Sequence, residues 1–454
     1  MSVIGLDVGT TTLSAVVLDA LTGETLETLS CESAAHIDGQ SWEDLQHPDM
    51  IVWRAHNIIS QLTSAFGPVD AIGLTGQMHG IVYLDAQGNA VSPLYTWQDA
   101  RGEEKMPGGD KTYVQKLTAL TGYPMATGFG LLTHYWHIEN KCIPEGATGI
   151  ATIHDYVGMK LTGRKTALTH VSDAASLGLF DKTRKAFDIS ACEKAGIDPS
   201  FLPEVVSDCQ TLGQTNDGIP VSVAIGDNQA GFIGTVREIE NSVMVNVGTS
   251  GQVSMMANVN NTPSAIESRP LNGDANILVG STLCGGRAYV RLEAFFRSCL
   301  ELAGVESGDL YAAMNKAGAE ALSYDDKLIV DTRFSGTRQQ PNLRGFIQNI
   351  DTHNLTANHL TGALLEGIAR ELHDLYTVML DSGAPMPSTL IGAGNALRKN
   401  PALVKALESA FYLKMQIPLH REEAAYGAAL FGLAAANLVP GLADAQKLIR
   451  YLEL

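Results

Sequence analysis

The sequence predicts an α/β protein built from two related halves, and three observations support this fold class. A hairpin pattern occurs twice, as "VIGLDVGTTTLSAVVLD" (residues 3–19) and as "VMVNVGTSGQVSMMANV" (243–259). In each half, strand-like apolar runs precede stretches with helical spacing that lead back into a strand. No low-complexity linker interrupts the chain. We therefore interpret the repeat as an internal duplication at the level of a half-chain, with the boundary near residues 228–240.

The individual elements follow from turn residues and apolar spacing. In the first half we expect the hairpin, a further strand, a helix over 49–67, and a strand–turn–strand unit over 69–97. In the second half we expect the repeated hairpin, followed by helices over 288–304 and 360–383, and by a strand, glycine turn and helix over 388–411. Asn400 and Pro401 suit the N-cap and first position of that last helix. The predicted domains are residues 1–230 and 231–454.

Composition excludes several classes of protein. The formal net charge of -18 argues against non-specific nucleic-acid binding, which depends on phosphate neutralisation by Lys and Arg. The six cysteines form no C-x-x-C pair, so we expect no zinc or thiol redox site and a cytoplasmic location. The small-residue stretch 424–443 contains Asn437 and Pro440, and we expect a buried helix there and not a membrane span.

The repeated turns favour phosphate binding over ordinary hairpin turns. Turns of this kind expose backbone N–H groups, and two of them can hold one polyphosphate from both sides. The residues concerned are Gly9, Thr10 and Thr11 in the first copy and Gly248, Thr249 and Ser250 in the second. Asp7 in the first copy can reach the accompanying Mg²⁺ through water, whereas a second acid at Asn246 would add repulsion.

A set of ordered motifs resembles the FGGY carbohydrate kinases of the actin-like ATPase fold. These motifs are "GLDVGTTTLSAVVLD", "GQMHG", "GDNQAG", "NVGTSGQV", "IGAGNALRKNP" and "EEAAYGAALFG", from residue 4 to about residue 432. The resemblance implies two ribonuclease-H-like domains flanking a central cleft, with sugar mostly on the first domain and nucleotide mostly on the second. It also implies ATP and Mg²⁺ as cofactors.

The same resemblance assigns roles to candidate site residues. Asp227 follows a small apolar strand; alone it could equally be a helix N-cap, and the resemblance makes it the general base. The sugar-binding candidates are Gln77, Met78, His79, Trp97, Asp99, His154, Asp155 and Asp227 itself. For several of them a structural alternative stays open: a satisfied core histidine at His79, a core tryptophan beside a solvated Asp–Arg pair in "TWQDARG", and a helix cap at Asp155 or Asp173.

Adenine and phosphate contacts are predicted in the second half. The candidates are the glycine turn with Gly392, Gly394 and Asn395, and Gly286 at the start of a helix. "HYWH" (134–137) carries two histidines on one helix face with no evident third ligand, so we do not predict a metal site there.

Within the family, "TWQDARG", "MATGFGLLTHYW" and "TIHDYV" look most like the sedoheptulokinases. We expect ATP-dependent phosphorylation of the terminal hydroxyl of a ketose, with sedoheptulose first and xylulose as the alternative. A partner-binding ATPase of the same fold is the rival from another class. Thr337, in the segment 334–346, stands where many family members carry an acid, and this departure weakens any role that the resemblance implies for the segment. We expect no membrane or nucleic-acid partner, and a homodimer stays open.

Overall fold

The computed structural model describes residues 1–259, 262–306 and 308–452. The chain forms two compact units. The first comprises Met1–Arg237, Pro270–Asp274 and Glu422–Ile449, and the second comprises Glu238–Arg269, Ala275–Arg421 and Arg450–Leu454. The change from the first unit to the second at Arg237 falls within the interval 228–240 that the sequence indicates.

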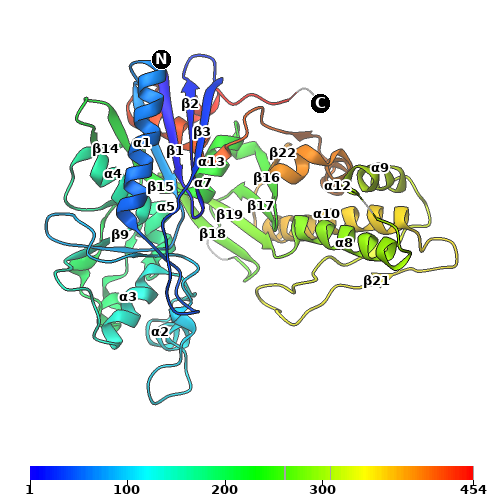
Figure 1. The fold of residues 1–454 in the computed structure, drawn as a ribbon, viewed down its shortest axis with the longest axis horizontal. Helices are drawn as coiled ribbons and strands as arrows, with labels where there is room; N and C mark the ends of the chain where they lie inside the picture. Colours follow the sequence, from blue (N-terminus) through cyan, green and yellow to red (C-terminus); the bar gives the residue numbers. More distant parts are fainter. Residues whose placement is uncertain (260–261, 307, 453–454) are drawn as a thin grey trace. The chain divides into compact units, whose positions relative to one another are not determined.

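The core of the first unit is a six-stranded mixed sheet (Figure 1). Its strand order is β14 (Thr211–Gln214), β15 (Pro220–Gly226), β6 (Ala71–Gly76), β1 (Ser2–Val8), β2 (Thr12–Asp19) and β3 (Thr25–Glu32). β1, β2 and β3 are antiparallel neighbours, whereas β1, β6 and β15 run parallel. Helices α1 (Pro48–Phe66) and α4 (Ile153–Thr162) cover one face, where their apolar side chains share a core with those of β1.

The second unit repeats this topology around its own six-stranded sheet. Its order is β18 (Ile266–Asn272), β19 (Ala275–Thr282), β17 (Gly251–Met256), β16 (Ser242–Val247), β22 (Thr389–Ala393) and β23 (Met415–Gln416). β16, β17 and β19 are antiparallel neighbours, and β16, β22 and β23 run parallel, as do their counterparts β1, β6 and β15. The duplication inferred from the hairpins therefore extends to five strands of each sheet.

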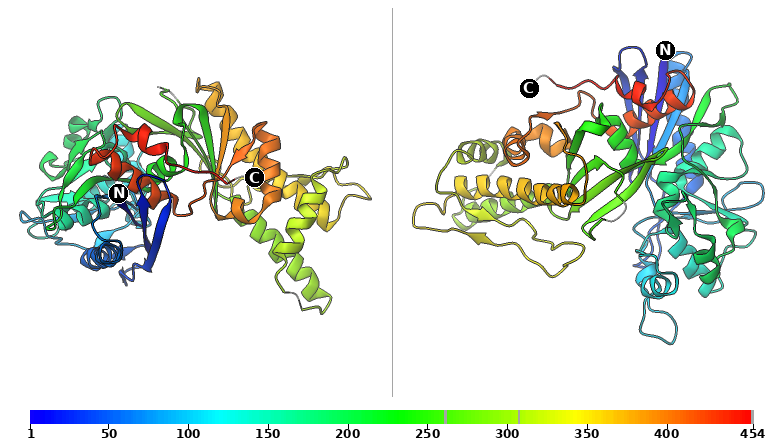
Figure 2. Two further views of the ribbon diagram at one scale, coloured as in Figure 1. Left: turned by 90° about the horizontal axis from the view of Figure 1, so that it is seen from above. Right: turned by 180° about the vertical axis from the view of Figure 1, so that it is seen from behind.

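The remaining elements surround these sheets. α10 (Ala357–Asp381) packs against β17 and β19 of the second sheet (Figure 2). Also in the second unit are α8 (Gly285–Leu302), α9 (Tyr311–Ala321), α11 (Asn395–Lys399), α12 (Pro401–Phe411), β20 (Ile329–Val330) and β21 (Ile347–Gln348). The first unit adds α2 (Tyr113–Thr121), α3 (Gly130–Glu139), α5 (Val171–Ala174), α6 (Ile189–Lys194), α7 (Asp227–Thr235), α14 (Leu442–Gln446) and the short strands β4 (His36–Ile37), β5 (Leu45–Gln46), β7 (Val82–Leu84), β8 (Leu94–Tyr95), β9 (Gly149–Ala151), β10 (Leu168–His170), β11 (Phe180–Asp181), β12 (Ala186–Phe187) and β13 (Glu204–Val206).

The C-terminal helix α13 (Glu423–Ala435) corrects the predicted domain division. The sequence places it in the second domain, but it packs on the first sheet and against α7, beside the N-terminal strands in Figure 1. A Cβ atom at Gly73 would lie only 1.7 Å from the carbonyl oxygen of Ala428, so a glycine is required for this approach. The helix is buried from Ala425 to Ala435, as its small residues predict. No helix among the described residues is long and apolar enough to cross a membrane.

Candidate active site

The predicted sugar and metal residues of the first unit meet at the carboxyl ends of three parallel strands. In the sheet register, Val8 at the end of β1 pairs with Gly76 at the end of β6, and Gly226 at the end of β15 pairs with the same Gly76. Asp7, the segment 77–79 and Asp227 therefore leave the sheet at one edge. This edge is where parallel α/β sheets bind ligands, because the connecting loops open there.

A hydrogen-bonded network joins the first phosphate hairpin to the predicted sugar segments. Trp97 donates from Nε1 to Thr10 Oγ1 (3.0 Å), and Thr10 Oγ1 donates to Gln77 Oε1 (3.2 Å). Gln77 Nε2 donates to Gln46 Oε1 (3.0 Å), and Gln46 Nε2 donates to the carbonyl of Thr10 (2.7 Å). Gln77 thus holds the hairpin turn, while Trp97 is 45% exposed and offers a ring face to a ligand. Gln46 was missed because nothing in its local sequence indicates a site.

His79 has an unusual backbone conformation for a histidine. Its φ angle is 75°, in the left-handed region, which costs free energy for a residue with a Cβ and is found most often at functional sites. Its ring stacks on Phe129 with centroids 4.9 Å apart, and its Nδ1 donates to the carbonyl of Ser176 (2.7 Å). Met78 is buried, and a Cβ at Gly226 would lie 2.7 Å from its sulfur. Met78 therefore packs directly behind the residue that precedes Asp227.

The segment "TWQDARG" differs from both expectations for it. Asp99 is 0% exposed, and its carboxylate accepts hydrogen bonds from Arg101 Nε (2.6 Å) and Nη2 (2.9 Å) and from the backbone N–H of Asp44 (3.2 Å). The Arg101 guanidinium in turn lies over the rings of Tyr95 (4.3 Å) and Trp136 (4.8 Å). Within this segment, the Asp99–Arg101 pair is therefore buried and Trp97 is exposed. This geometry does not support the predicted contact between Asp99 and a sugar hydroxyl.

The two histidines of "HYWH" lie on one face of α3, and both are buried. His134 Nδ1 hydrogen-bonds the hydroxyl of Tyr83 (2.7 Å), and His137 Nδ1 donates to the carbonyl of Thr133 (2.8 Å). Burial lowers the pKa of His134 to about 4, and burial together with Arg101 lowers the pKa of His137 to about 3. Both rings are therefore neutral at physiological pH and serve the aromatic core of this region.

Asp7 and Asp227 provide carboxylates at the strand ends. Asp7 Oδ1 is buried with no hydrogen-bond partner among the described residues. Burial, followed by the negative charge of Asp227, raises the pKa of Asp7 to about 7, and His154 opposes the shift. Asp227 is the first residue of α7 and is exposed, and the N-cap position belongs to Gly226. Asp227 is therefore not the helix N-cap, which was the alternative to a catalytic role.

A hydrated Mg²⁺ fits this pair of carboxylates. An unsatisfied buried carboxylate oxygen beside a second negative charge is costly, and a divalent cation relieves that cost. Within the described residues, no three His, Cys, Asp or Glu side chains form a metal cage. One acid that reaches the ion through water is the arrangement that Mg²⁺ commonly adopts beside substrate phosphates.

His154 and Asp155, predicted to bind sugar, lie in the interior of the first unit. His154 Nε2 lies 3.1 Å from Asp173 Oδ2, and both side chains are 0% exposed. The backbone N–H of Asp155 donates to Thr152 Oγ1 (3.2 Å), so Thr152 is the N-cap of α4. Burial raises the pKa of Asp155, and His154 opposes that shift. This geometry favours a role behind the site over direct contact with a sugar.

The predicted nucleotide residues of the second unit also come together. The turn Gly248–Ser250 is exposed between β16 and β17. The backbone N–H of Gly286 donates to the carbonyl of Gly248 (2.9 Å), and the next N–H donates to that of Thr249 (3.0 Å). Ala393, which precedes Gly394, pairs in register with Asn246. Three separate sequence segments therefore form one region, with Asn395 opening α11 and Gly392 packed on Met415.

Gly394 should be intolerant of substitution. Its φ angle is 92°, and a Cβ would lie 2.5 Å from Asn246 Oδ1 and 2.6 Å from the carbonyl oxygen of Val247. We expect Gly394→Ala to reduce stability by about 1–3 kcal/mol and to raise the KM for ATP several-fold. Thermal unfolding and kinetics at saturating sugar measure the two effects.

Gly383→Ala is the matched control, because Gly383 has a φ of 97° and a Cβ at this position would meet no atom within 4 Å. This variant should lose only the stability that an alanine costs in a left-handed backbone conformation, and its KM for ATP should be unchanged. Equal KM values in the two alanine variants would contradict a nucleotide role for the Gly394 turn.

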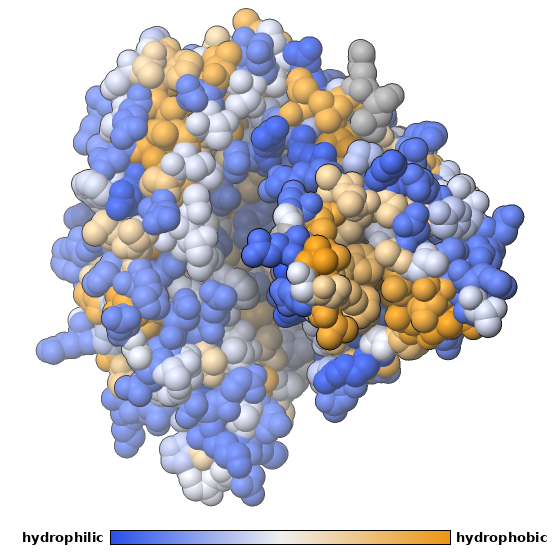
Figure 3. Space-filling model, turned by 45° about the vertical axis from the view of Figure 1, so that its right-hand side comes forward, coloured by the Kyte–Doolittle hydropathy of each residue, from blue (hydrophilic) through white to orange (hydrophobic). Residues whose placement is uncertain are grey.

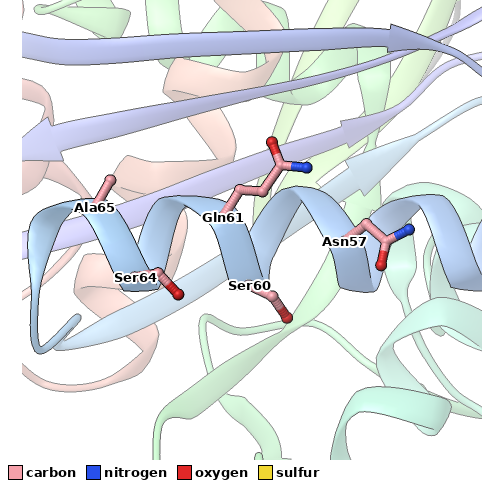
Figure 4. A pocket seen from close by; sticks show the side chains of 5 residues that line it. All are labelled: Asn57, Ser60, Gln61, Ser64 and Ala65. Atoms are coloured by element: carbon pink, nitrogen blue, oxygen red, sulfur yellow. The ribbon is translucent and has the colours of Figure 1, made fainter.

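Other hollows in the described part of the chain lie outside these clusters, and two of them bear on the argument. One of about 500 Å³ lies on a face of α1 and is lined by amide and hydroxyl side chains and one alanine: Asn57, Ser60, Gln61, Ser64 and Ala65 (Figure 4). The other, of about 540 Å³, lies beside α10 in the second unit and includes Thr337, Gln339 and Gln340 of the segment 334–346. Neither is lined by a predicted site residue.

The face in Figure 3 shows hydrophobic patches separated by hydrophilic residues.

Comparisons with known proteins find matches over most of this chain. The description "FGGY family of carbohydrate kinases, N-terminal domain" matches residues 2–234, and its C-terminal counterpart matches residues 243–436. The chain is 27% identical to a sedoheptulokinase of Mus musculus over 94% of this chain and 96% of that protein. It is 26% identical to a xylulose kinase of Streptomyces coelicolor over 97% and 88%. A crystal structure of a "xyloylose kinase" from Brucella ovis has the same fold, with a TM-score of 0.84, 22% identity and coverage of 100% and 94%.

Proposed function

Because this chain belongs to the FGGY family of carbohydrate kinases, we propose that it transfers the γ-phosphoryl group of ATP to the terminal hydroxyl of a ketose, with sedoheptulose as the preferred acceptor. The chain is an ATP-dependent sugar kinase, and Mg²⁺ accompanies the nucleotide. This assignment sets aside the partner-binding ATPase as the rival from another class. The identity of the sugar and the roles of individual residues are the parts proposed here.

The proposed reaction needs a base at the acceptor and charge neutralisation at the phosphates. Asp227 accepts the proton of the terminal hydroxyl, the hydroxyl oxygen forms a bond to the γ-phosphorus, and the bond to the β–γ bridging oxygen breaks to release ADP. Mg²⁺ supplies neutralisation of the phosphate charge when bound, and Asp7 would hold it through water. Asp227 suits the role because it is exposed at the end of β15.

The sugar is proposed to lie against residues 77–79 and Trp97. The exposed ring of Trp97 can pack on the C–H face of a sugar, and its Nε1 is already oriented by Thr10. His79 is held in its strained conformation beside Phe129, so its position is fixed before a ligand arrives. The observation that carries this proposal is the convergence of these residues with Asp227 at one sheet edge.

The nucleotide is proposed to contact the glycine segments and the hairpin turn of the second unit, and the hairpin turn of the first unit is proposed as a phosphate-binding turn of that unit. The turn Gly248–Ser250 is exposed and the turn Gly9–Thr11 is partly exposed, and both suit phosphate oxygens. Gly392, Gly394 and Asn395 allow close backbone approach for the adenine. Gly286 connects these two parts, because it bonds the second hairpin at the start of α8.

Sedoheptulose is favoured by the extent of the similarity. The match to the Mus musculus sedoheptulokinase covers 96% of that protein, whereas the match to the Streptomyces coelicolor xylulose kinase covers 88%. Xylulose is the second candidate, because the identities of 27% and 26% are nearly equal.

A coupled ADP-release assay over ketoses and polyols of three to seven carbons tests this proposal. We expect kcat/KM for sedoheptulose to exceed that for xylulose and glycerol by about tenfold or more, which corresponds to one or two differential contacts. A higher kcat/KM for xylulose would make xylulose the preferred acceptor, and the chain would still be a sugar kinase. ADP release that no sugar stimulates would contradict the ketose proposal altogether.

A further inference from the structure

The hydrogen-bonded network around Thr10 begins and ends at this one residue. Thr10 Oγ1 accepts from Trp97 Nε1 (3.0 Å) and donates to Gln77 Oε1 (3.2 Å). Gln77 Nε2 donates to Gln46 Oε1 (3.0 Å), and Gln46 Nε2 donates to the backbone carbonyl of Thr10 (2.7 Å). Gln46 is 5% exposed and Gln77 is 3% exposed. The two amide groups therefore depend on these bonds and not on water.

The two ends of the network fix the direction of every hydrogen bond in it. An indole N–H can only donate, so Thr10 Oγ1 accepts from Trp97, and a carbonyl oxygen can only accept, so Gln46 must turn its NH₂ group toward Thr10. The Gln46 oxygen then faces Gln77 Nε2, and the Gln77 oxygen accepts the hydroxyl proton of Thr10. Reversing both amides would place two acceptors, Gln46 Oε1 and the Thr10 carbonyl, against each other.

Gln46 is the residue on which these orientations depend. Without its side chain, the buried Nε2 of Gln77 loses its acceptor, which costs free energy. The Gln77 amide is then free to turn its NH₂ group toward Thr10 Oγ1, and the hydroxyl proton of Thr10 loses its acceptor as well. The Thr10 carbonyl keeps the hydrogen bond from Ser33 Oγ (3.1 Å) but loses the shorter one from Gln46.

The indole of Trp97 is the part of the network that faces solvent. Its side chain is 45% exposed, so packing restrains the ring less than it would restrain a buried one. The hydrogen bond from Nε1 to Thr10 therefore has a large influence on the direction in which the ring faces a ligand. Hydrogen bonds in series also strengthen one another, so a change at Gln46 reaches this bond.

We propose that Gln46 is a positioning residue, which holds the indole of Trp97 for the sugar and the turn at Thr10 for phosphate through one hydrogen-bonded network. A ring and a turn that are fixed before the ligands arrive lose less entropy on binding. The inference deepens the proposed function and rests on it, because it requires the sugar to pack on Trp97. It also commits the hydroxyl proton of Thr10 to Gln77, so backbone N–H groups make the phosphate contacts of this turn.

A double-mutant cycle on the Kd for sedoheptulose, measured by calorimetry, tests this inference. Gln46→Met keeps the length of the side chain and removes both hydrogen-bonding groups, and we expect the Kd to rise about tenfold. Trp97→Phe keeps an aromatic ring and removes the N–H, and we expect a rise of about fivefold. Because Gln46 acts on the ring through that N–H, the double variant should bind at most about threefold more weakly than Trp97→Phe. Independent structural effects would instead multiply to about 50-fold.

Exchange of the Trp97 indole proton with solvent gives a second measurement, which needs no sugar. The signal is identified in protein labelled at tryptophan nitrogen, because Trp97→Phe removes it. We expect Gln46→Met to speed this exchange about tenfold, since the acceptor of the proton loses its fixed orientation.

Gln446→Met is the matched control for both measurements. Gln446 is a buried glutamine of the same unit, and its Nε2 donates to the carbonyls of Ile233 (3.3 Å) and Val236 (2.8 Å), at the opposite end of α7 from the candidate active site. This variant should lower Tm and leave the Kd for sedoheptulose and the indole exchange within about twofold of the wild type.

A Kd for sedoheptulose in Gln46→Met within about twofold of the wild type would overturn the inference, as would losses that multiply in the double variant. If Gln46→Met does not fold, Thr10→Val takes its place in the cycle, because valine keeps the shape of threonine and removes the hydroxyl. Thr10→Ser keeps the hydroxyl and should bind within about threefold of the wild type. Equal Kd values for the two Thr10 variants would then overturn the inference.

Trp97→Ala separates this inference from the proposed function. Weak sugar binding by Trp97→Ala together with wild-type binding by Gln46→Met removes only the positioning role of Gln46. Wild-type sugar binding by Trp97→Ala removes the proposed sugar contact itself, whatever the Gln46 variants show.

Discussion

Asp227→Asn is expected to lower kcat by about 10²- to 10⁴-fold while the affinity for the sugar changes little. The substitution keeps the shape of the side chain and removes its basic oxygen. Because the N-cap of α7 is Gly226, we expect the substitution to keep the fold. The loss should therefore fall on an interaction needed mainly in the transition state. Steady-state kinetics at saturating ATP and calorimetry with sugar alone measure the two quantities.

Asp188→Asn provides the matched control for this prediction. Asp188 is an aspartate at a helix start in the same unit, where its carboxylate accepts a hydrogen bond from the backbone N–H of Ala191 (3.0 Å). Its replacement should lower Tm only slightly and leave kcat unchanged, because asparagine also caps helices. An Asp227→Asn enzyme that turns over normally once sugar is raised would falsify the general-base role.

Local chemistry explains which features the sequence predicts well. The two hairpins depend on short turns between apolar runs, and both occur in the structure. The cap of α12 depends on two neighbouring residues: Asn400 Oδ1 accepts from the backbone N–H groups of Ala402 and Leu403, both at 3.1 Å, and Pro401 follows it as predicted. These features are fixed within a few residues, so a single sequence contains the whole signal.

Long-range packing explains what the sequence does not predict. α13 packs on the first sheet because Gly73 and Ala428 are both small, and nothing near either residue indicates that they meet. In "TWQDARG" both an exposed and a buried Asp–Arg pair satisfy the local pattern. The rings of Tyr95 and Trp136, brought from other elements, decide that Arg101 is buried.

The same limit applies to the candidate active site. Strand-end residues such as Asp7 and Asp227 can be found from the sequence, because apolar strands and glycine turns place them. Ser172 and Ser176 cannot, because their role lies in hydrogen bonds to Gly226 and His79, which are distant in the chain. The segment around them drew attention only for Asp173. Residues that position a site through long-range hydrogen bonds are therefore harder to predict from the sequence than residues that carry its functional groups.

Removing the carboxylate of Asp7 is expected to lower turnover by about 100-fold or more at saturating sugar. Charge neutralisation by a bound metal ion accounts for several kcal/mol of transition-state stabilisation, and each 1.4 kcal/mol is a factor of about ten in rate. Asp7→Asn keeps the volume of the side chain and removes its charge. Kinetics over a magnesium titration measure the loss, which excess magnesium should recover only in part.

Asn246→Ala is the matched control, because Asn246 occupies the equivalent position one residue before the end of the strand in the second hairpin and carries no acid. This variant should alter the KM for ATP without shifting the magnesium dependence. Unchanged turnover of Asp7→Asn at ordinary magnesium levels would contradict the metal assignment.

The thermal stability of Asp7→Asn as a function of pH tests the burial of this carboxylate without an activity assay. Its Oδ1 atom is buried, and burial and Asp227 raise the pKa of Asp7 to about 7, so its ionised form opposes folding. Because the folded-state pKa lies above the unfolded value, this opposition is largest above about pH 7 and is lost as the pH falls toward about 4. In the absence of metal, Asp7→Asn should therefore have a higher Tm than the wild type at about pH 8 and an equal Tm near pH 4. A lower Tm for the variant at about pH 8 would mean that the carboxylate stabilises the fold, and that its unpaired oxygen does not need a cation.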